Sequence, residues 1–182
     1  MNEEVEVNEN KGFPWKALAV FVVVIIGVTL FNAFTMDTTD LGELEGNSGA
    51  LLFGGAAVGS VFGAIGAIIV LSIQYAFTKF PTQWISKEEN VYKYDIWSAL
   101  FYSSAIGTIM TTLLQQLNMD ANLIASSIVS ILTTGLFLFF YFSGEEKEQH
   151  VKKAITIVQV AWLVIGLVIS AASVAFLNNT GL

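Results

Sequence analysis

Five long apolar blocks constrain this chain more than any other feature. They cover residues 15–34, 50–77, 96–117, 123–142 and 154–177. Each is near or above the ~20 residues that a helix needs to cross a bilayer core of about 30 Å. A soluble chain of 182 residues could not hide five such blocks, and its 54% hydrophobic content exceeds the roughly 45–50% of soluble domains. We therefore predict an all-α, polytopic integral membrane bundle of five transmembrane helices.

The segments between these blocks are polar. Residues 1–13 form an acidic stretch that cannot bury enough apolar surface to order itself, so we expect a disordered cytoplasmic tail before a single membrane domain over 14–182. Residues 37–45 carry four carboxylates without the spacing of an EF-hand loop. We interpret them as a solvated loop and leave open whether they bind a cation.

Lysine residues predict the orientation of the five spans. Lys11 and Lys16 precede or begin the first span, Lys79, Lys87 and Lys93 follow the second, and Lys147, Lys152 and Lys153 follow the fourth. The other connections and the C-terminal tail have none. Because cytoplasmic connections are enriched in lysine, this alternation predicts a cytoplasmic N-terminus and a C-terminus on the outside.

The second block carries glycines at helical spacing. Gly55, Gly59, Gly63 and Gly66 would lie on one side of a helix and leave a flat groove for close helix packing. We expect this groove to pack against another helix of the same chain. A face for homodimer formation is the alternative.

Hydroxyl and amide side chains form stripes on the last three spans. The members are Ser104, Thr108, Thr111 and Gln115, then Ser126, Ser130 and Thr133, then Gln159 and Ser170. Such residues usually form interhelical hydrogen bonds in membrane proteins. The alternative is a polar cavity between spans three, four and five for a small solute.

The connection after the second span mixes aromatic residues with lysine. Trp84, Lys87, Tyr92 and Lys93 belong to a stretch, residues 78–95, that we interpret as polar and located in the headgroup layer. One interpretation is an aromatic belt at the ends of two helices. The alternative is that this cytoplasmic connection forms a short interfacial helix and serves as a docking surface.

Chemistry-bearing motifs are scarce. No charged residue lies clearly within an apolar block. Pumps and ion-coupled transporters usually need such residues, so the sequence argues against these two classes of protein. His150 is the single histidine and cysteine is absent, so we expect neither a metal site nor a cofactor, and no enzyme. The net charge of −7 argues against nucleic acid as a partner.

With its spans placed, the chain resembles the Yip family, small five-span membrane proteins first known as partners of Ypt/Rab GTPases. The resemblance covers residues 13–177. It depends on the run Tyr92-Lys93-Tyr94-Asp95-Ile96-Trp97-Ser98-Ala99-Leu100-Phe101-Tyr102-Ser103-Ser104 into the third span and on Lys152-Lys153-Ala154-Ile155 before the fifth.

This resemblance implies a non-enzymatic protein that binds or organises other membrane components, with the lipid bilayer and another membrane protein or a second copy as partners. The Lys- and Asn-rich, Arg-free composition favours a bacterial relative and the bacterial cell membrane. The alternative function is a small-solute transport component, such as an immunity- or efflux-type permease subunit.

Overall fold

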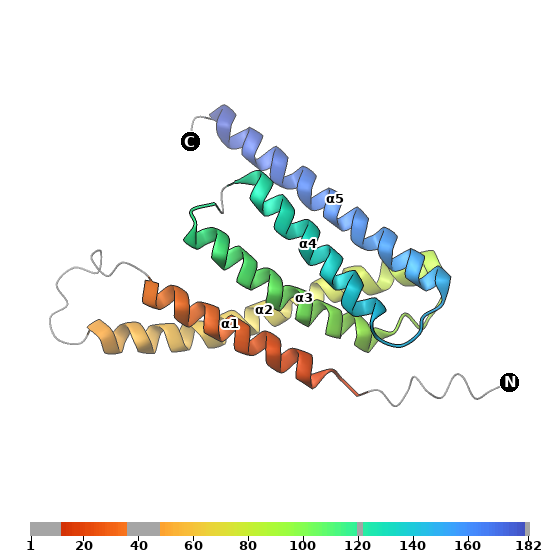
Figure 1. Ribbon diagram of the computed structural model, residues 1–182, viewed down its shortest axis with the longest axis horizontal. Helices are drawn as coiled ribbons and strands as arrows, with labels where there is room; N and C mark the ends of the chain where they lie inside the picture. The colour runs from red at the N-terminus through yellow and green to blue at the C-terminus, as the bar shows by residue number, and fades with distance from the viewer. Residues whose placement is uncertain (1–11, 36–47, 120–121, 181–182) are drawn as a thin grey trace.

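The computed structural model describes residues 12–35, 48–119 and 122–180, and these form an all-α bundle without strands (Figure 1). Residues 1–11 of the acidic tail and the 37–45 loop lie outside the described residues. The helices are α1 (Trp15–Thr35), α2 (Ser48–Ser86), α3 (Lys93–Gln116), α4 (Leu123–Phe142) and α5 (Gln149–Thr180). All five are long and apolar enough to cross a membrane, as the sequence predicts.

Helix α3 lies at the centre of the bundle. It packs most extensively against α4, then against α1, and also touches α2. Small buried residues, including Ala99, Ser103 and Ala105, allow its neighbours to approach closely. At Gly107 a Cβ atom would lie only 3.0 Å from Oγ1 of Thr133 on α4, so the two helices are in close contact at this glycine.

Helices α3 and α4 form an antiparallel hairpin. Asn118 adopts φ 53°, a left-handed conformation that asparagine tolerates. The Asn122 side chain then caps α4 by accepting hydrogen bonds from the backbone N–H groups of Ile124 and Ala125. The short turn makes the two helices antiparallel neighbours.

Helix α2 corrects the predicted boundary of the second span. It continues nine residues past Phe77 to Ser86, so most of the supposed polar connection is helical. Pro81 lies inside the helix and cannot donate to the carbonyl of Phe77. The indole Nε1 of Trp162 on α5 donates to that carbonyl at 3.2 Å, which explains how the helix passes the proline.

The bundle has two ends of different character. At the first, the 87–92 and 143–148 connections meet: Tyr141 donates a hydrogen bond to the carbonyl of Val91 at 3.1 Å. Phe13, just before α1, packs on Trp97 there. We name this the lysine end. The opposite end, where α3 ends and α4 begins, is the open end.

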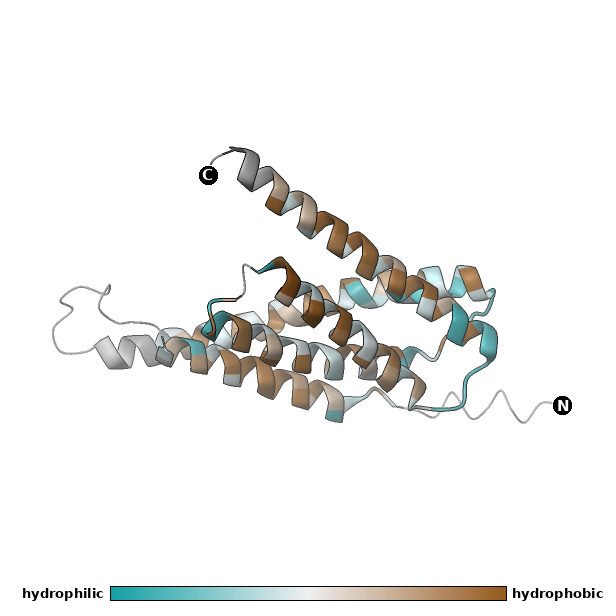
Figure 2. Cartoon of the chain, turned by 45° about the horizontal axis from the view of Figure 1, so that its top comes forward, coloured by the Kyte–Doolittle hydropathy of each residue, from teal (hydrophilic) through white to brown (hydrophobic). Residues whose placement is uncertain are grey.

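Helices α2 and α5 contact each other toward the lysine end and then diverge (Figure 1). Gln159 donates to Oγ1 of Thr78 at 3.0 Å inside this contact. Beyond it, the side chains of α5 from Val160 to Ala175 are all exposed or half-buried. Figure 2 shows apolar residues along these helices and hydrophilic ones mainly at the connections.

Candidate functional site

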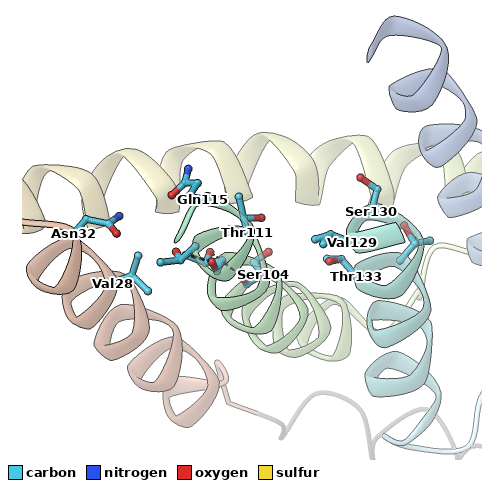
Figure 3. A pocket seen from close by; sticks show the side chains of 12 residues that line it. Val28, Asn32, Ser104, Thr111, Gln115, Val129, Ser130 and Thr133 are labelled. Atoms are coloured by element: carbon cyan, nitrogen blue, oxygen red, sulfur yellow. Dashed lines mark hydrogen bonds between the residues drawn. The ribbon is translucent and has the colours of Figure 1, made fainter. Parts of the chain in front are cut away.

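A polar groove of about 570 Å³ lies between α1, α3 and α4 in the half of the bundle toward the open end (Figure 3). Its lining comprises Val28 and Asn32 from α1, Ser104, Gly107, Thr108, Thr111, Thr112 and Gln115 from α3, and Val129, Ser130, Thr133 and Thr134 from α4. At 1.5 Å per residue, the stretch from Ser104 to Gln115 spans about 17 Å. The groove therefore extends over roughly half the thickness of a bilayer core.

Six of the nine residues predicted to line a cavity lie in this groove. Four come from α3 and two from α4, because the hairpin brings the two polar stripes side by side. The third wall differs from the prediction: it is α1, through Val28 and Asn32, and not α5. The sequence missed α1 because Asn32 is an isolated polar residue near the end of an apolar helix.

The other three residues lie elsewhere. Ser126 is half-buried on α4 outside the groove lining, and Ser170 is exposed on the diverging part of α5. Gln159 is buried and bonded to Thr78 at the contact between α2 and α5. Gln159 therefore forms an interhelical hydrogen bond, which is the first of the two interpretations of the polar stripes.

Part of the polar lining is already hydrogen-bonded within its own helix. Thr108 donates to the carbonyl of Ser104 at 2.8 Å, and Ser130 donates to the carbonyl of Ser126 at 3.0 Å. The side chains of Thr111, Gln115 and Thr133 make no hydrogen bond within the described part of the chain. These three are therefore among the groups that can bond to a visiting molecule.

No side chain in the lining is ionisable at neutral pH. The groove therefore offers no general acid, general base or charged metal ligand, and its chemistry is that of neutral donors and acceptors. It is also open along its length and not an enclosed cavity. What it can do is bind a neutral hydrogen-bonding group that approaches from the side.

The predicted packing of the glycine face is not found within the described residues. A Cβ atom at Gly55, Gly59, Gly63 or Gly66 would meet nothing within 4 Å. Instead the buried residues of α2 in this region are Ser60, Ala64 and Leu71, on a stripe about 100° around the helix. The helix uses this second small-residue stripe for packing, and the glycines face outward.

The predicted docking residues differ in their exposure. Trp84 is in the last turn of α2 and is 77% exposed, and Lys87 and Lys93 are exposed. Tyr92, at φ 55°, is half-buried with its ring 5.0 Å from Nζ of Lys147. Burial and then the nearby carboxylates, Glu148 first, raise the pKa of Tyr92.

A buried ion pair is the feature that sequence reasoning missed. Lys147 has a fully buried side chain, with Nζ 2.8 Å from Oδ2 of Asp95 and 2.9 Å from the carbonyl oxygen of Glu145, to which it donates. The rings of Tyr92 and Tyr141 lie 5.0 and 4.6 Å from the same nitrogen. We name these four side chains, Tyr92, Asp95, Tyr141 and Lys147, the lysine cage.

The lysine cage joins the start of α3 to the connection before α5. Its two charges are 52 positions apart, and both belong to polar connections of the sequence, so no local spacing reveals the pair. The only local signal of the pair is an aromatic residue near each charge: Tyr92 close to Asp95, and Tyr141 just before the 143–148 connection. Because every partner is engaged, the cage is structural and does not offer an open binding site.

We compared the chain with known proteins. No family model matches it, and no match is found among curated proteins or among solved structures.

Proposed function

We propose that this protein is a non-enzymatic, multi-pass membrane protein whose groove binds a transmembrane helix of another membrane protein. The observation that carries this proposal is the open groove, with the free hydrogen-bonding side chains of Thr111, Gln115 and Thr133 at bilayer depth. Hydroxyl and amide groups facing hydrocarbon are unfavourable unless they find a partner. Residues of this kind recur where membrane helices associate.

The shape of the groove favours a helix over a small molecule. Small-molecule sites enclose about 70–90% of the ligand surface, which an open groove cannot do. A partner helix carrying Ser, Thr, Asn or Gln would cover the groove along its length. Each interhelical hydrogen bond contributes on average about 0.6 kcal/mol, so several contacts and close packing must act together.

The proposed orientation puts the lysine end in the cytoplasm and the open end outside. Every lysine among the described residues belongs to the lysine end: Lys16 begins α1, Lys79 and Lys87 lie in or after the last turns of α2, Lys93 begins α3, and Lys147, Lys152 and Lys153 lie before or within the start of α5. The positive-inside rule supports this orientation. The resemblance to the Yip family favours the same partner-binding role, in a bacterial cell membrane.

Site-specific crosslinking tests the proposal, and the absence of cysteine makes single-cysteine variants straightforward. Thr111→Cys places a thiol in the groove, and Ile109→Cys places one on another exposed face of α3. We expect a bifunctional, thiol-directed crosslinker in native membranes to join the first variant, and not the second, to a discrete membrane protein. Equal crosslinking from both positions, or none from either, would contradict the proposal.

A small neutral solute is the second candidate occupant of the same groove, because about 570 Å³ lies within the usual range for ligand sites. In that case a water-soluble maleimide should label Thr111→Cys in native membranes, since the groove would be hydrated and uncovered. A covering helix would instead protect this thiol until detergent separates the partner. The two occupants therefore predict opposite labelling.

A further inference from the structure

We propose that Glu88, Glu148 and His150 form a binding site for a divalent transition-metal ion at the lysine end. Glu88 belongs to the 87–92 connection, Glu148 precedes α5, and His150 is the second residue of α5. One ligand atom from each lies within 4.8 Å of the others. The fold thus brings together residues that are 62 positions apart in the sequence.

Both carboxylates converge on the same imidazole nitrogen. Nε2 of His150 is 3.1 Å from Oε1 of Glu88 and 2.9 Å from Oε2 of Glu148. A neutral imidazole has one proton or one lone pair at Nε2, so it cannot satisfy both carboxylates fully. A cation between the three groups would accept the lone pair of the nitrogen and neutralise both negative charges.

The spacing fits a metal ion with little movement. Zinc bonds to imidazole nitrogen and carboxylate oxygen are about 2.0–2.2 Å, so two ligands at tetrahedral angles are roughly 3.4 Å apart. The distances from Nε2 of His150 to the two carboxylate oxygens, 3.1 and 2.9 Å, are only slightly shorter. The side chains are about half exposed, at 45%, 61% and 47% for Glu88, Glu148 and His150, so water can fill the remaining coordination position.

The backbone that carries these ligands is anchored on both sides. Val91 and Val151, close to Glu88 and His150 in sequence, are each 1% exposed, and Lys147 precedes Glu148 inside the lysine cage. Gln83 donates from Nε2 to the carbonyl of Glu89 at 2.6 Å. Ligands held by a fixed backbone lose less entropy when the ion binds.

The donor set selects the class of ion. Imidazole with carboxylates suits Zn²⁺, Mn²⁺ or Fe²⁺, whereas Mg²⁺ and Ca²⁺ prefer oxygen ligands alone. Because the ligands come from both connections, a bound ion would tie the end of α2 to the start of α5. The site lies at the end opposite the groove, so it is independent of the proposed helix-binding function.

Zinc titration of the full-length chain, purified in detergent without a histidine tag, tests the site. We expect one Zn²⁺ per chain by calorimetry, a raised thermal unfolding temperature with zinc, and resistance to a 100-fold excess of Mg²⁺. The variants His150→Ala, Glu88→Gln and Glu148→Gln should each weaken binding at least ten-fold, the minimum loss caused by removing even an outer-shell partner. Displacement by Mg²⁺, or no binding by the wild type, would overturn the proposal.

Two control variants make the result specific. Glu146→Gln removes an exposed carboxylate from the same connection but outside the cluster, and Glu43→Gln removes one from the acidic 37–45 segment. Both should bind zinc like the wild type. Since all three ligands are exposed, the ligand variants should keep the wild-type circular dichroism and elution volume. Unchanged zinc binding in the triple variant would refute the site.

Discussion

The two ends of the bundle are built differently although the same helices run through both. At the lysine end Val91, Ile96, Tyr141, Val151 and Ile155 are at most 1% exposed. Toward the open end, large apolar side chains such as Phe62, Ile124 and Val168 are 62–72% exposed. The first end is closed by side chains from distant segments, whereas at the second the helices diverge and present their apolar faces outward.

This difference assigns separate roles to the two ends. The buried contacts and the lysine cage fix the relative positions of the helices at the lysine end. The open end carries the groove and the outward glycine face, and its exposed surface is available to lipid or to a partner. Substitutions in the buried contacts of the lysine end should therefore change stability, and those on the exposed surface of the open end should change association.

The largest effect is expected for Lys147→Met, which keeps the side-chain volume but removes the charge. Asp95 would then remain buried without its cation, which typically destabilises a protein by about 3–5 kcal/mol. Thermal unfolding in detergent should show a large decrease in the midpoint temperature. The exposed Lys153→Met is the matched control and should have little effect.

A double variant separates the lost charge from lost packing. Asp95→Asn with Lys147→Met removes both charges, so it should recover a substantial part of the stability lost by Lys147→Met alone. If the double variant is no more stable than the single one, the ion pair is not what holds this end together.

Gly144→Ala should have the next largest effect. A Cβ atom at this position would lie 2.6 Å from Oδ2 and 2.8 Å from Cγ of Asp95, which the ion pair with Lys147 holds in place. Overpacking of this kind costs about 1–3 kcal/mol. Gly166→Ala on α5, where a Cβ meets nothing within 4 Å, should be neutral or slightly stabilising. Equal midpoints for both variants would disprove the close contact.

A smaller effect is expected for Trp162→Phe, which removes the donor to the carbonyl of Phe77. The loss should be near the average interhelical value of about 0.6 kcal/mol. In a Pro81→Ala background the backbone N–H of residue 81 can bond to this carbonyl, so the same substitution should then cost less. An unchanged cost in both backgrounds would show that the indole does not compensate for the proline.

The sequence predicted the class of fold and six of the twelve residues that line the groove, for identifiable reasons. Apolar length and period are local properties, so the five helices and the stripe from Ser104 to Gln115 could be read directly. The extension of α2 past Pro81 could not, because it depends on a donor, Trp162, from α5. The lysine cage and the His150 cluster also depend on contacts between distant connections.

The glycine face is where sequence and structure differ most usefully. The spacing alone could not tell which of two neighbouring small-residue stripes packs inside the chain. The structure has Ser60 and Ala64 buried and the glycines outward. Gly59→Leu therefore distinguishes folding from association, because the new side chain meets no described atom near its Cβ.

We expect Gly59→Leu to change stability by no more than about 0.5 kcal/mol, the usual range for surface substitutions. Ser60→Leu, one residue away but buried at 3% exposure, is the matched control and should destabilise the bundle through overpacking. Thermal unfolding distinguishes the two variants, and blue-native electrophoresis of native membranes reports on assembly. Loss of a larger complex in Gly59→Leu with unchanged unfolding would show that the open end is an association surface. Equal destabilisation by both leucines would instead mean that the glycine face packs within the chain, and the contrast between the two ends would fail.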